Sequence, residues 1–474
     1  MAPMTAPAYM QQLQIAIDDE NGRRLAQLFS MRDHHAVALF QGLSPLDKTL
    51  DQANPSYIQA FSKRFKGQWS AWAELAASHT QVIVALNDFR PDSVTGRARK
   101  NGDMITAFQK QHELVNVLYR WLMSQANPTG WLLPLLYQAC RDLKDLAQQA
   151  DGQHALRGEK LKELEEASRL MQKCFSACVN DRGADNRTSR KMGTYYMAVL
   201  MFKTYIKLRS TALCKNLVRG IGAADLAPFE AYPSSHQVAY LYYMGVFAFL
   251  REDYTDAEKN LLAALSKVHS RSTRNIEQVW RFLGLTLAYY NCFCRLILNY
   301  LIPLILLRGV LPSAKTLAMS ERLAAVYRPF LEAFKTGNVQ LYDSQLQVAE
   351  KRLMERGTYL IVERAREGAV RALLKKAWIL EAKPARMSIE RFQAYYTRGT
   401  GTDIDAEEME CVIANMIYKN LMKGYISHQH QLVVLSKQNP FPWYPPFRDR
   451  GEVAKRRREE QEVAERQKMP PGIA

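Results

Sequence analysis

The stretch from Asp405 to Lys437 decides how the C-terminal part of the chain folds, and it reads DAEEMECVIANMIYKNLMKGYISHQHQLVVLSK. Its first residue is followed three positions later by Glu408, which is the spacing of a capping box at a helix start. Apolar residues then recur with the 3.6-residue period of a helix. Gly424 is expected to end this helix in the left-handed conformation. Two short runs with the composition of strands follow, at 425–427 and 432–436.

A shorter helix is predicted just before this stretch. Ser388 can cap a helix that carries Phe392 and Tyr395 on one face, and a Gly/Thr-rich loop at 398–403 comes after it. Helix, turn, helix and then a small hairpin is the order of a winged helix. We therefore predict a winged helix over 381–437.

The chain before residue 381 is dominated by helical periodicity. Breakers such as Pro91 and Asn127-Pro128 separate long amphipathic stretches. Helices joined by short turns over such a length indicate an α-solenoid. The amphipathic stretches cover 55–88, 103–124, 131–149, 156–179 and 189–221.

The clearest repeat unit lies at 236–269. Thr255 and Glu258 have the spacing of a capping box at the start of its second helix, and the small residues Gly245 and Ala257 allow two helices to approach closely. This spacing fits one tetratricopeptide hairpin, although any tight helical hairpin favours small residues at such positions.

The predicted fold class is therefore all-α: a tetratricopeptide-like helical-repeat solenoid capped by a C-terminal winged helix with a small β-hairpin. We expect the following divisions: N-terminal helical repeats over 1–185, a basic linker repeat over 186–235, further helical repeats over 236–380, the winged helix over 381–437, and a Pro-rich and charged tail over 438–474.

The composition narrows the class of partner. The 474 residues carry a formal net charge of +17, which favours nucleic acid, an anionic membrane or an acidic protein. The alternative is a basic protein without such a partner. The seven cysteines are scattered and odd in number, which fits reduced thiols in the cytosol or nucleus. Asp18, Asp19 and Glu20 lie where a secretory signal needs apolar residues, so no such signal is expected.

One apolar segment, 282–310, could suggest a membrane span. Charged or helix-breaking residues interrupt it, among them Arg295, Pro303 and Arg308, so no uninterrupted run reaches the length of a span. A buried helix pair is the preferred interpretation, and no membrane span is expected.

Several segments resemble one family. They include Cys174-Phe-Ser-Ala-Cys178, Phe202-Lys203-Thr-Tyr205 and, most specifically, Gly424-Tyr-Ile-Ser-His-Gln-His430 continuing to Ser436-Lys-Gln-Asn-Pro-Phe-Pro442. In these segments the chain resembles the PCI domain-containing protein 2 family, whose fungal members are usually called COP-nine signalosome subunit 12 homologues. The resemblance covers 170–443 and implies a PCI domain over 236–437. Relative to the family, 279–295 is extra, either as a true insertion or as a retained intron.

The resemblance implies a role in transcription-coupled mRNA export in the nucleus, at the nuclear pore, with some protein in the cytoplasm. Family members pair with a large scaffold subunit of the mRNA-export complex and with a small, acidic, disordered subunit. Two winged helices side by side then form a platform for nucleic acid. The alternative is a subunit of a signalosome-like complex or of a complex associated with splicing or transcription elongation.

A basic strip without any acidic residue covers 186–220. A solvated helix face normally mixes both signs, so an acidic partner or a phosphate backbone is the preferred interpretation over a merely solvated face. The residues predicted to bind the acidic partner are Arg190, Lys191, Lys203, Lys207 and Lys215.

A second basic strip, 351–386, has ten basic and four acidic residues and adjoins the winged helix. We expect point-charge contacts with RNA or DNA backbone that read no sequence. Glu407, Glu408 and Glu410 make the long helix of the winged helix a poor sequence reader. The residues predicted to bind nucleic acid are Arg364, Arg371, Lys375, Lys376, Lys419, Lys423, His428, His430 and Lys437.

Catalytic and metal sites are not expected. The sequence has no phosphate-binding Gly-x4-Gly-Lys-Ser/Thr loop, no His-Glu-x2-His and no Gly-x-Ser-x-Gly. Cys174 and Cys178 lack a second ligand pair, so core packing is preferred over zinc. His428 and His430 are expected to lie in a solvated turn. We therefore predict a scaffold without cofactors or enzymatic activity.

Overall fold

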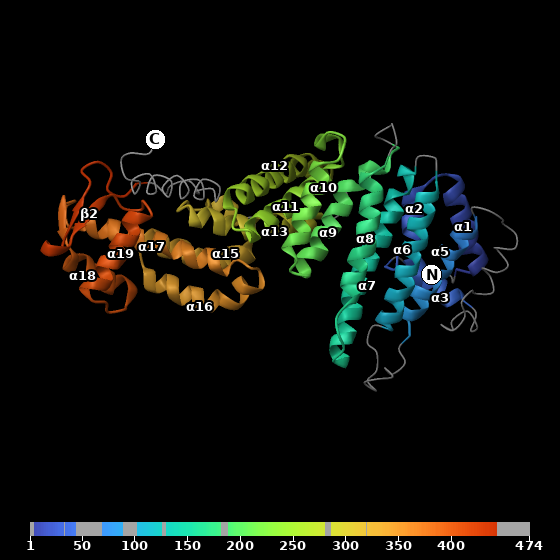
Figure 1. The fold of residues 1–474 in the computed structure, drawn as a ribbon, viewed down its shortest axis with the longest axis horizontal. Coiled ribbons are helices and arrows are strands. Elements are labelled where there is room, and N and C mark those ends of the chain that lie inside the picture. Colours follow the sequence, from blue (N-terminus) through green and yellow to red (C-terminus); the bar gives the residue numbers. More distant parts are fainter. Residues whose placement is uncertain are drawn as a thin grey trace, which may run out of the picture. The chain divides into compact units, whose positions relative to one another are not determined.

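The computed structural model describes residues 4–32, 34–43, 69–88, 102–125, 129–181, 188–279, 286–318 and 320–442. Contacts divide the chain into two compact units, Met1–Tyr243 and Met244–Ala474, which are called unit 1 and unit 2 below. The division falls inside α11 (Ser234–Leu250). Figure 1 labels the helices and strands.

Unit 1 is built from helices in which each long helix from α5 to α9 packs against the next one in the sequence. Its core comes from their apolar faces, such as Leu114 and Leu118 of α6 and Leu143 of α7, which are buried. The helices are α1 (Ala6–Asp18), α2 (Gly22–Leu28), α3 (His34–Gly42), α5 (Trp69–Leu86), α6 (Met104–Ser124), α7 (Leu133–Arg157), α8 (Glu163–Val179), α9 (Thr194–Lys207) and α10 (Thr211–Gly222), with short 3-10 turns at Gly130–Leu132, Arg190–Gly193 and Phe229–Ala231.

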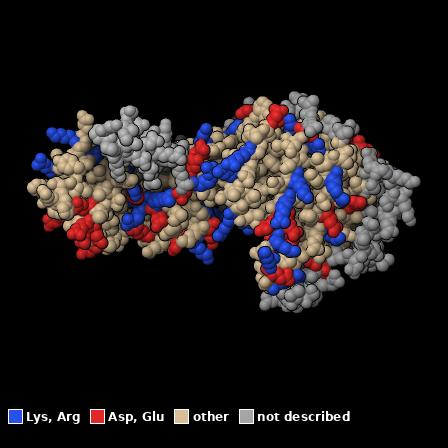
Figure 2. Space-filling model, viewed as in Figure 1, with Lys and Arg blue, Asp and Glu red and all other residues tan. Residues whose placement is uncertain are grey.

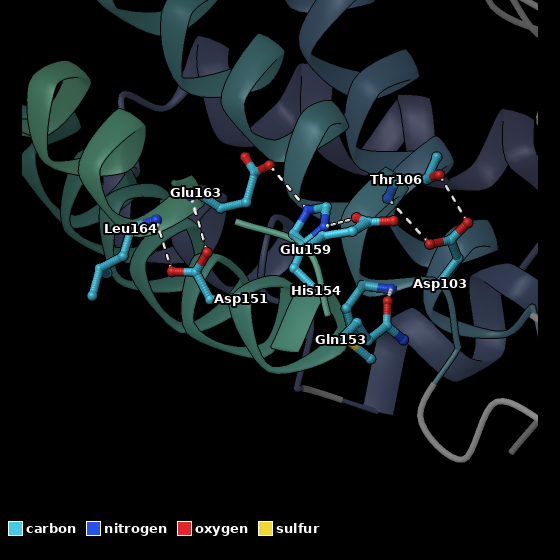
Figure 3. A network of polar contacts seen from close by, with 9 residues as sticks. Asp103, Thr106, Asp151, Gln153, His154, Glu159, Glu163 and Leu164 are labelled. Atoms are coloured by element: carbon cyan, nitrogen blue, oxygen red, sulfur yellow. Dashed lines mark hydrogen bonds and ion pairs between the residues drawn. The ribbon is translucent and has the colours of Figure 1, made fainter. Parts of the chain in front are cut away.

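A polar network fixes the turn between α7 and α8 (Figure 3). The carboxylate of Asp151 accepts hydrogen bonds from the backbone N–H groups of Glu163 and Leu164, at 3.0 and 3.1 Å, and so caps α8. The ring of His154 lies between two carboxylates, with Nδ1 2.5 Å from Glu159 and Nε2 3.2 Å from Glu163. These contacts set the register of one helical hairpin.

Unit 2 continues the helical hairpins and ends in the winged helix. Its helices before the winged helix are the C-terminal part of α11, α12 (Tyr254–Val279), α13 (Thr286–Leu307), α14 (Ala314–Ala318), α15 (Glu321–Thr336), α16 (Val339–Glu355) and α17 (Tyr359–Leu380). The winged helix consists of β1 (Arg386–Ser388), α18 (Ile389–Thr400), α19 (Ala406–Tyr418), β2 (Gly424–Ser427), a 3-10 turn at His428–His430, and β3 (Leu432–Leu435). The predicted fold class is confirmed.

The hairpin predicted at 236–269 is α11 followed by α12. Gly245 is needed there, because a Cβ atom on it would lie 2.7 Å from Cγ of Leu261 on α12. The capping box predicted at Thr255 is wrong, since α12 begins at Tyr254 and the side chain of Asp253 accepts a hydrogen bond from the backbone at the helix start. The carboxylate of Glu258 instead binds Arg308, which directly follows α13.

In the winged helix, the predicted helix starts are confirmed but the predicted end of the long helix is wrong. The capping box of Asp405 and Glu408 is confirmed, with the Glu408 N–H donating to Asp405 at 2.7 Å. Ser388 caps α18 as predicted. Gly424 does not end the long helix, which stops at Tyr418, and it begins β2 instead. A Cβ on Gly424 would lie 2.3 Å from the carbonyl oxygen of Val434, so glycine permits the close approach of β3.

The sheet of the winged helix has three strands rather than the predicted two, because β1 joins the hairpin. All pairs are antiparallel and the order is β1-β3-β2. One face of the sheet is buried through Met387, Val433 and Leu435. The sheet therefore has an inner face in the core and an outer face toward solvent.

Two sequence predictions fall largely outside the described residues. In the extra segment at 279–295, residues 280–285 and the side chains of the rest are not described. In the tail predicted at 438–474, residues 443–474 are not described. None of the helices that are described is both long and apolar enough to cross a membrane.

Candidate nucleic-acid and partner interface

Arg190, the first residue of the predicted acidic-partner surface, points into unit 1. Its Nη2 and Nε donate to Oδ1 of Asp181 at 2.7 and 3.0 Å, and its Nη1 donates to the carbonyl oxygen of Leu122 at 2.7 Å. Burial acts to raise the pKa of Asp181, but hydrogen bonds from Ser189 and Arg190 hold that pKa below its usual value. Because its guanidinium already binds Asp181 and Leu122, Arg190 is not available to an acidic partner protein. The prediction that it binds such a protein is therefore corrected, and Arg190 has a structural role.

The other members of this first strip lie nearer to solvent. Lys203, Lys207 and Lys215 are exposed on α9 and α10. Lys191 is partly covered and pairs with Asp225 at 3.5 Å. Lys203 and Lys207 are four residues apart and so share one face of α9.

Lys203 also has neighbours that the sequence did not indicate. Its Nζ lies 5.9 Å from the ring centre of Tyr243. Partial burial, together with the positive charges of Lys144 and Arg141 on α7, lowers the pKa of its ammonium group. Both cations are already engaged within unit 1, because Arg141 donates to the hydroxyl of Tyr196 at 2.6 Å and Lys144 pairs with Asp145 at 2.7 Å. They lie about sixty residues earlier in the chain, among acidic residues, so no local pattern marks them.

The residues of the second basic strip that were predicted to bind nucleic acid lie on α17. Most of them have partners within unit 2. Arg364 donates to Glu252 at 3.4 Å and to the hydroxyl of Tyr254 at 3.1 Å. Lys376 donates to the carbonyl oxygen of Thr336 at 2.8 Å. Lys375 is exposed.

Arg371 holds the end of the winged helix in place. Its Nη2 donates to the carbonyl oxygens of Phe441 and Pro442, at 3.0 and 2.5 Å. The ring of Phe441 is buried, and its centre lies 5.8 Å from that of Trp378. Because this guanidinium anchors the chain, Arg371 is also corrected from a nucleic-acid contact to a structural residue.

The winged helix separates its charges. Figure 2 shows acidic side chains gathered over α18 and α19, whereas basic side chains project from the part that carries the strands. Lys419, the C-cap residue of α19, pairs with Glu367. Nδ1 of His428 lies 2.8 Å from Glu410, and the hydrogen bond to that carboxylate raises the pKa of His428.

Three predicted residues remain open to solvent at the strands. Lys423, His430 and Lys437 are exposed, and no side-chain hydrogen bond or ion pair joins them to other residues in the described part of the chain. The backbone N–H of Ser436 donates to the carbonyl oxygen of Lys423 at 2.9 Å. Lys423 and Lys437 therefore both lie at the open end of the β2–β3 hairpin, while His430 lies at its turn.

The cysteines of unit 1 are part of the core. Cys140, Cys174, Cys178 and Cys214 are buried, and burial raises the pKa of Cys178 and brings that of Cys214 to about 11. The thiols of Cys178 and Cys214 are therefore protonated at neutral pH. The described residues contain no group of three or more His, Cys, Asp or Glu side chains arranged to hold a metal ion.

Helical hairpins that lead into a winged helix define a class, and residues 347–437 match the family model of the PCI domain. A CSN12 homolog of Mycosarcoma maydis is 35% identical over 407 residues, which is 79% of this chain and 85% of that protein. PCI domain-containing protein 2 of Xenopus laevis is 30% identical over 93% of this chain and 98% of its own length. Enhanced ethylene response protein 5 of Arabidopsis thaliana is 31% identical over 84% and 87%. The chain belongs to the family of CSN12 homologues and PCI domain-containing protein 2.

Proposed function

We propose that this protein is a non-catalytic PCI scaffold subunit that binds protein partners and the backbone of RNA or DNA in transcription-coupled mRNA export. It acts in the nucleus and at the nuclear pore, with a fraction in the cytoplasm. Its partners are a large scaffold subunit and a small, acidic, disordered subunit of the export complex. Membership of a family of complex subunits supports the scaffold role.

The observation that carries nucleic-acid binding is the set of unpaired cations at the strands of the winged helix. Lys423 and Lys437 are both exposed at the open end of the hairpin, whereas Lys419 and Arg371 already have partners within the protein. Lysine ammonium groups bind phosphate as point charges and release counterions, so binding of this kind depends steeply on salt and reads no sequence.

A salt titration tests this proposal. Changing both Lys423 and Lys437 to glutamine should weaken RNA binding and reduce the slope of log affinity against log salt by about 1.4, or roughly 0.7 per lost contact with a single strand. Lys376→Gln is the matched control, because its ammonium group already binds the carbonyl oxygen of Thr336. An affinity that does not change with salt would refute backbone binding.

The acidic partner is proposed to bind the strip formed by Lys203, Lys207 and Lys215. Burial is the main cause of the lowered pKa of Lys203, and the positive charges of Lys144 and Arg141 lower it further; an anionic partner would relieve that repulsion. Lys203→Glu with Lys207→Glu should abolish capture of the acidic subunit. Capture at the wild-type level would refute this use of the strip.

Co-purification from nuclear extract, followed by mass spectrometry, distinguishes the complexes. Recovery of the export scaffold is expected. Recovery of signalosome subunits or splicing factors without that scaffold would refute the export role and favour the alternative complex.

A further inference from the structure

The outer face of the winged-helix sheet carries a row of exposed side chains that extends beyond Lys423. Antiparallel register places Arg386 of β1 opposite Val434 of β3, and Val434 opposite Tyr425 of β2. Since alternate residues of a strand point to opposite faces, Lys423, two residues before Tyr425, lies on the same face. The core residues Met387 and Val433 are on the other face.

This face combines an aromatic ring with positive charge. Tyr425 is 61% exposed, and Arg386 and Lys423 are exposed as well. No acidic residue occupies the face within the described strands, whose remaining outer residues are Ser388, Ser427, Leu432 and Val434. A solvated sheet face would normally mix both signs, and a tyrosine there would normally be covered.

The spacing suits a nucleotide chain. Strand geometry places Lys423 about 7 Å along β2 from Tyr425, and Arg386 about 10 Å away across two strand spacings. Long basic side chains at these distances can reach the phosphates on either side of a base that lies on the ring. An unpaired base offers its flat face to such a ring, whereas the bases of a duplex are already stacked on one another.

We propose that the outer face of this sheet binds single-stranded nucleic acid, with Tyr425 stacking on an unpaired base and with Arg386 and Lys423 binding the flanking phosphates. This inference rests on the nucleic-acid binding proposed above. It adds that the nucleic acid is single-stranded and names the residue that stacks on its bases. Stacking tolerates any base, so the site reads no sequence.

Fluorescence anisotropy with the full-length chain tests it, using a short labelled oligouridylate and a blunt RNA duplex. Tyr425→Ala should weaken binding of the single strand roughly 5- to 150-fold, as expected for one lost stacking contact, without changing the salt slope. Tyr425→Phe should stay within about twofold of the wild type. Tyr418→Ala is the matched control, because Tyr418 is even more open to solvent but belongs to α19.

A separate variant tests the contribution of positive charge to binding of the single strand. Arg386→Gln should lower the salt slope for the single strand by about 0.7. Arg391→Gln is its control, because the guanidinium of Arg391 pairs with Glu381. Duplex binding should respond to neither tyrosine variant.

The outcomes separate this inference from the proposed function. If the wild type binds the single strand but Tyr425→Ala behaves like Tyr418→Ala, stacking on the sheet is wrong and the proposed function stands. If Tyr425→Ala releases a protein subunit from the complex and leaves RNA affinity unchanged, the face is a protein contact and the inference is again wrong. If the wild type binds no nucleic acid, both fail.

Discussion

Replacing Arg190 with alanine should destabilise the region around α8 and α9 by about 2–4 kcal/mol. Its side chain is 15% exposed and that of Asp181 is 10% exposed, so the pair is largely shielded from water. Removing one partner of a buried ion pair costs about 3–5 kcal/mol, because the other charge is left without compensation. Asp181 keeps hydrogen bonds from the Ser189 hydroxyl and the backbone N–H of residue 190, which reduces the expected cost.

Hydrogen exchange followed by mass spectrometry can measure this loss on peptides from α8 and α9, without mixing in the unfolding of unit 2. A double-mutant cycle with Asp181→Asn isolates the pair, and we expect the two changes to be clearly non-additive. Lys207→Ala serves as the exposed control and should change the free energy of opening by less than about 0.5 kcal/mol. A loss below that value for Arg190→Ala, additive with Asp181→Asn, would refute the reasoning.

The same variant separates a structural role from a binding role. Because the guanidinium of Arg190 faces Asp181 and Leu122, folded Arg190→Ala protein should retain the acidic partner at wild-type affinity. A surface role would produce the opposite pattern, with normal hydrogen exchange and lost capture.

Three further predictions concern buried groups. Burial raises the pKa of Asp142 to about 6, so the folded state holds this proton more tightly than the unfolded state. Relative to Asp142→Asn, the wild type should therefore lose up to about 3 kcal/mol of stability as pH rises from 4 to 7, measured by urea unfolding at each pH. Burial lowers the pKa of His79 to about 3, so stability should fall by about 1.4 kcal/mol per unit as pH drops below 6.5, and His79→Phe should reduce that slope in the same assay. Gly245→Val should cost about 1–3 kcal/mol through overlap with Leu261, whereas Gly152→Ala, in open space, should be neutral or stabilising in thermal unfolding.

The sequence predicts the parts of the fold that depend on neighbouring residues. The caps at Ser388 and Asp405 are confirmed because a cap joins groups only a few positions apart. The prediction at Thr255 is wrong because Asp253, two residues earlier, competes for the same backbone groups. Gly424 is misassigned for a different reason: the approach of β3, a tertiary contact, is what requires a glycine there.

The charged surfaces are harder to predict. The sequence shows where a charged residue stands, but the partner that neutralises it can lie far away along the chain. Arg371 and Lys423 look alike as basic residues near the winged helix. The partners of Arg371 lie seventy or more residues along the chain, and the one carboxylate that binds Lys419 lies 52 residues away. A basic strip therefore indicates where cations gather, whereas the fold decides which of them remain available to phosphate.

The acidic residues of α19 show how folding limits the mode of binding. Glu407 and Glu408 lie in the first turn, where negative charge favours the helix N-terminus, and Glu408 completes the capping box. Glu410 is held by His428, next to the β2–β3 hairpin. Carboxylates that stabilise this helix also repel phosphate from it, so the helix that would normally enter a DNA groove is unsuited to that task. Positive charge without such carboxylates is found instead on the outer face of the sheet, which is why we place nucleic-acid contacts on the strands.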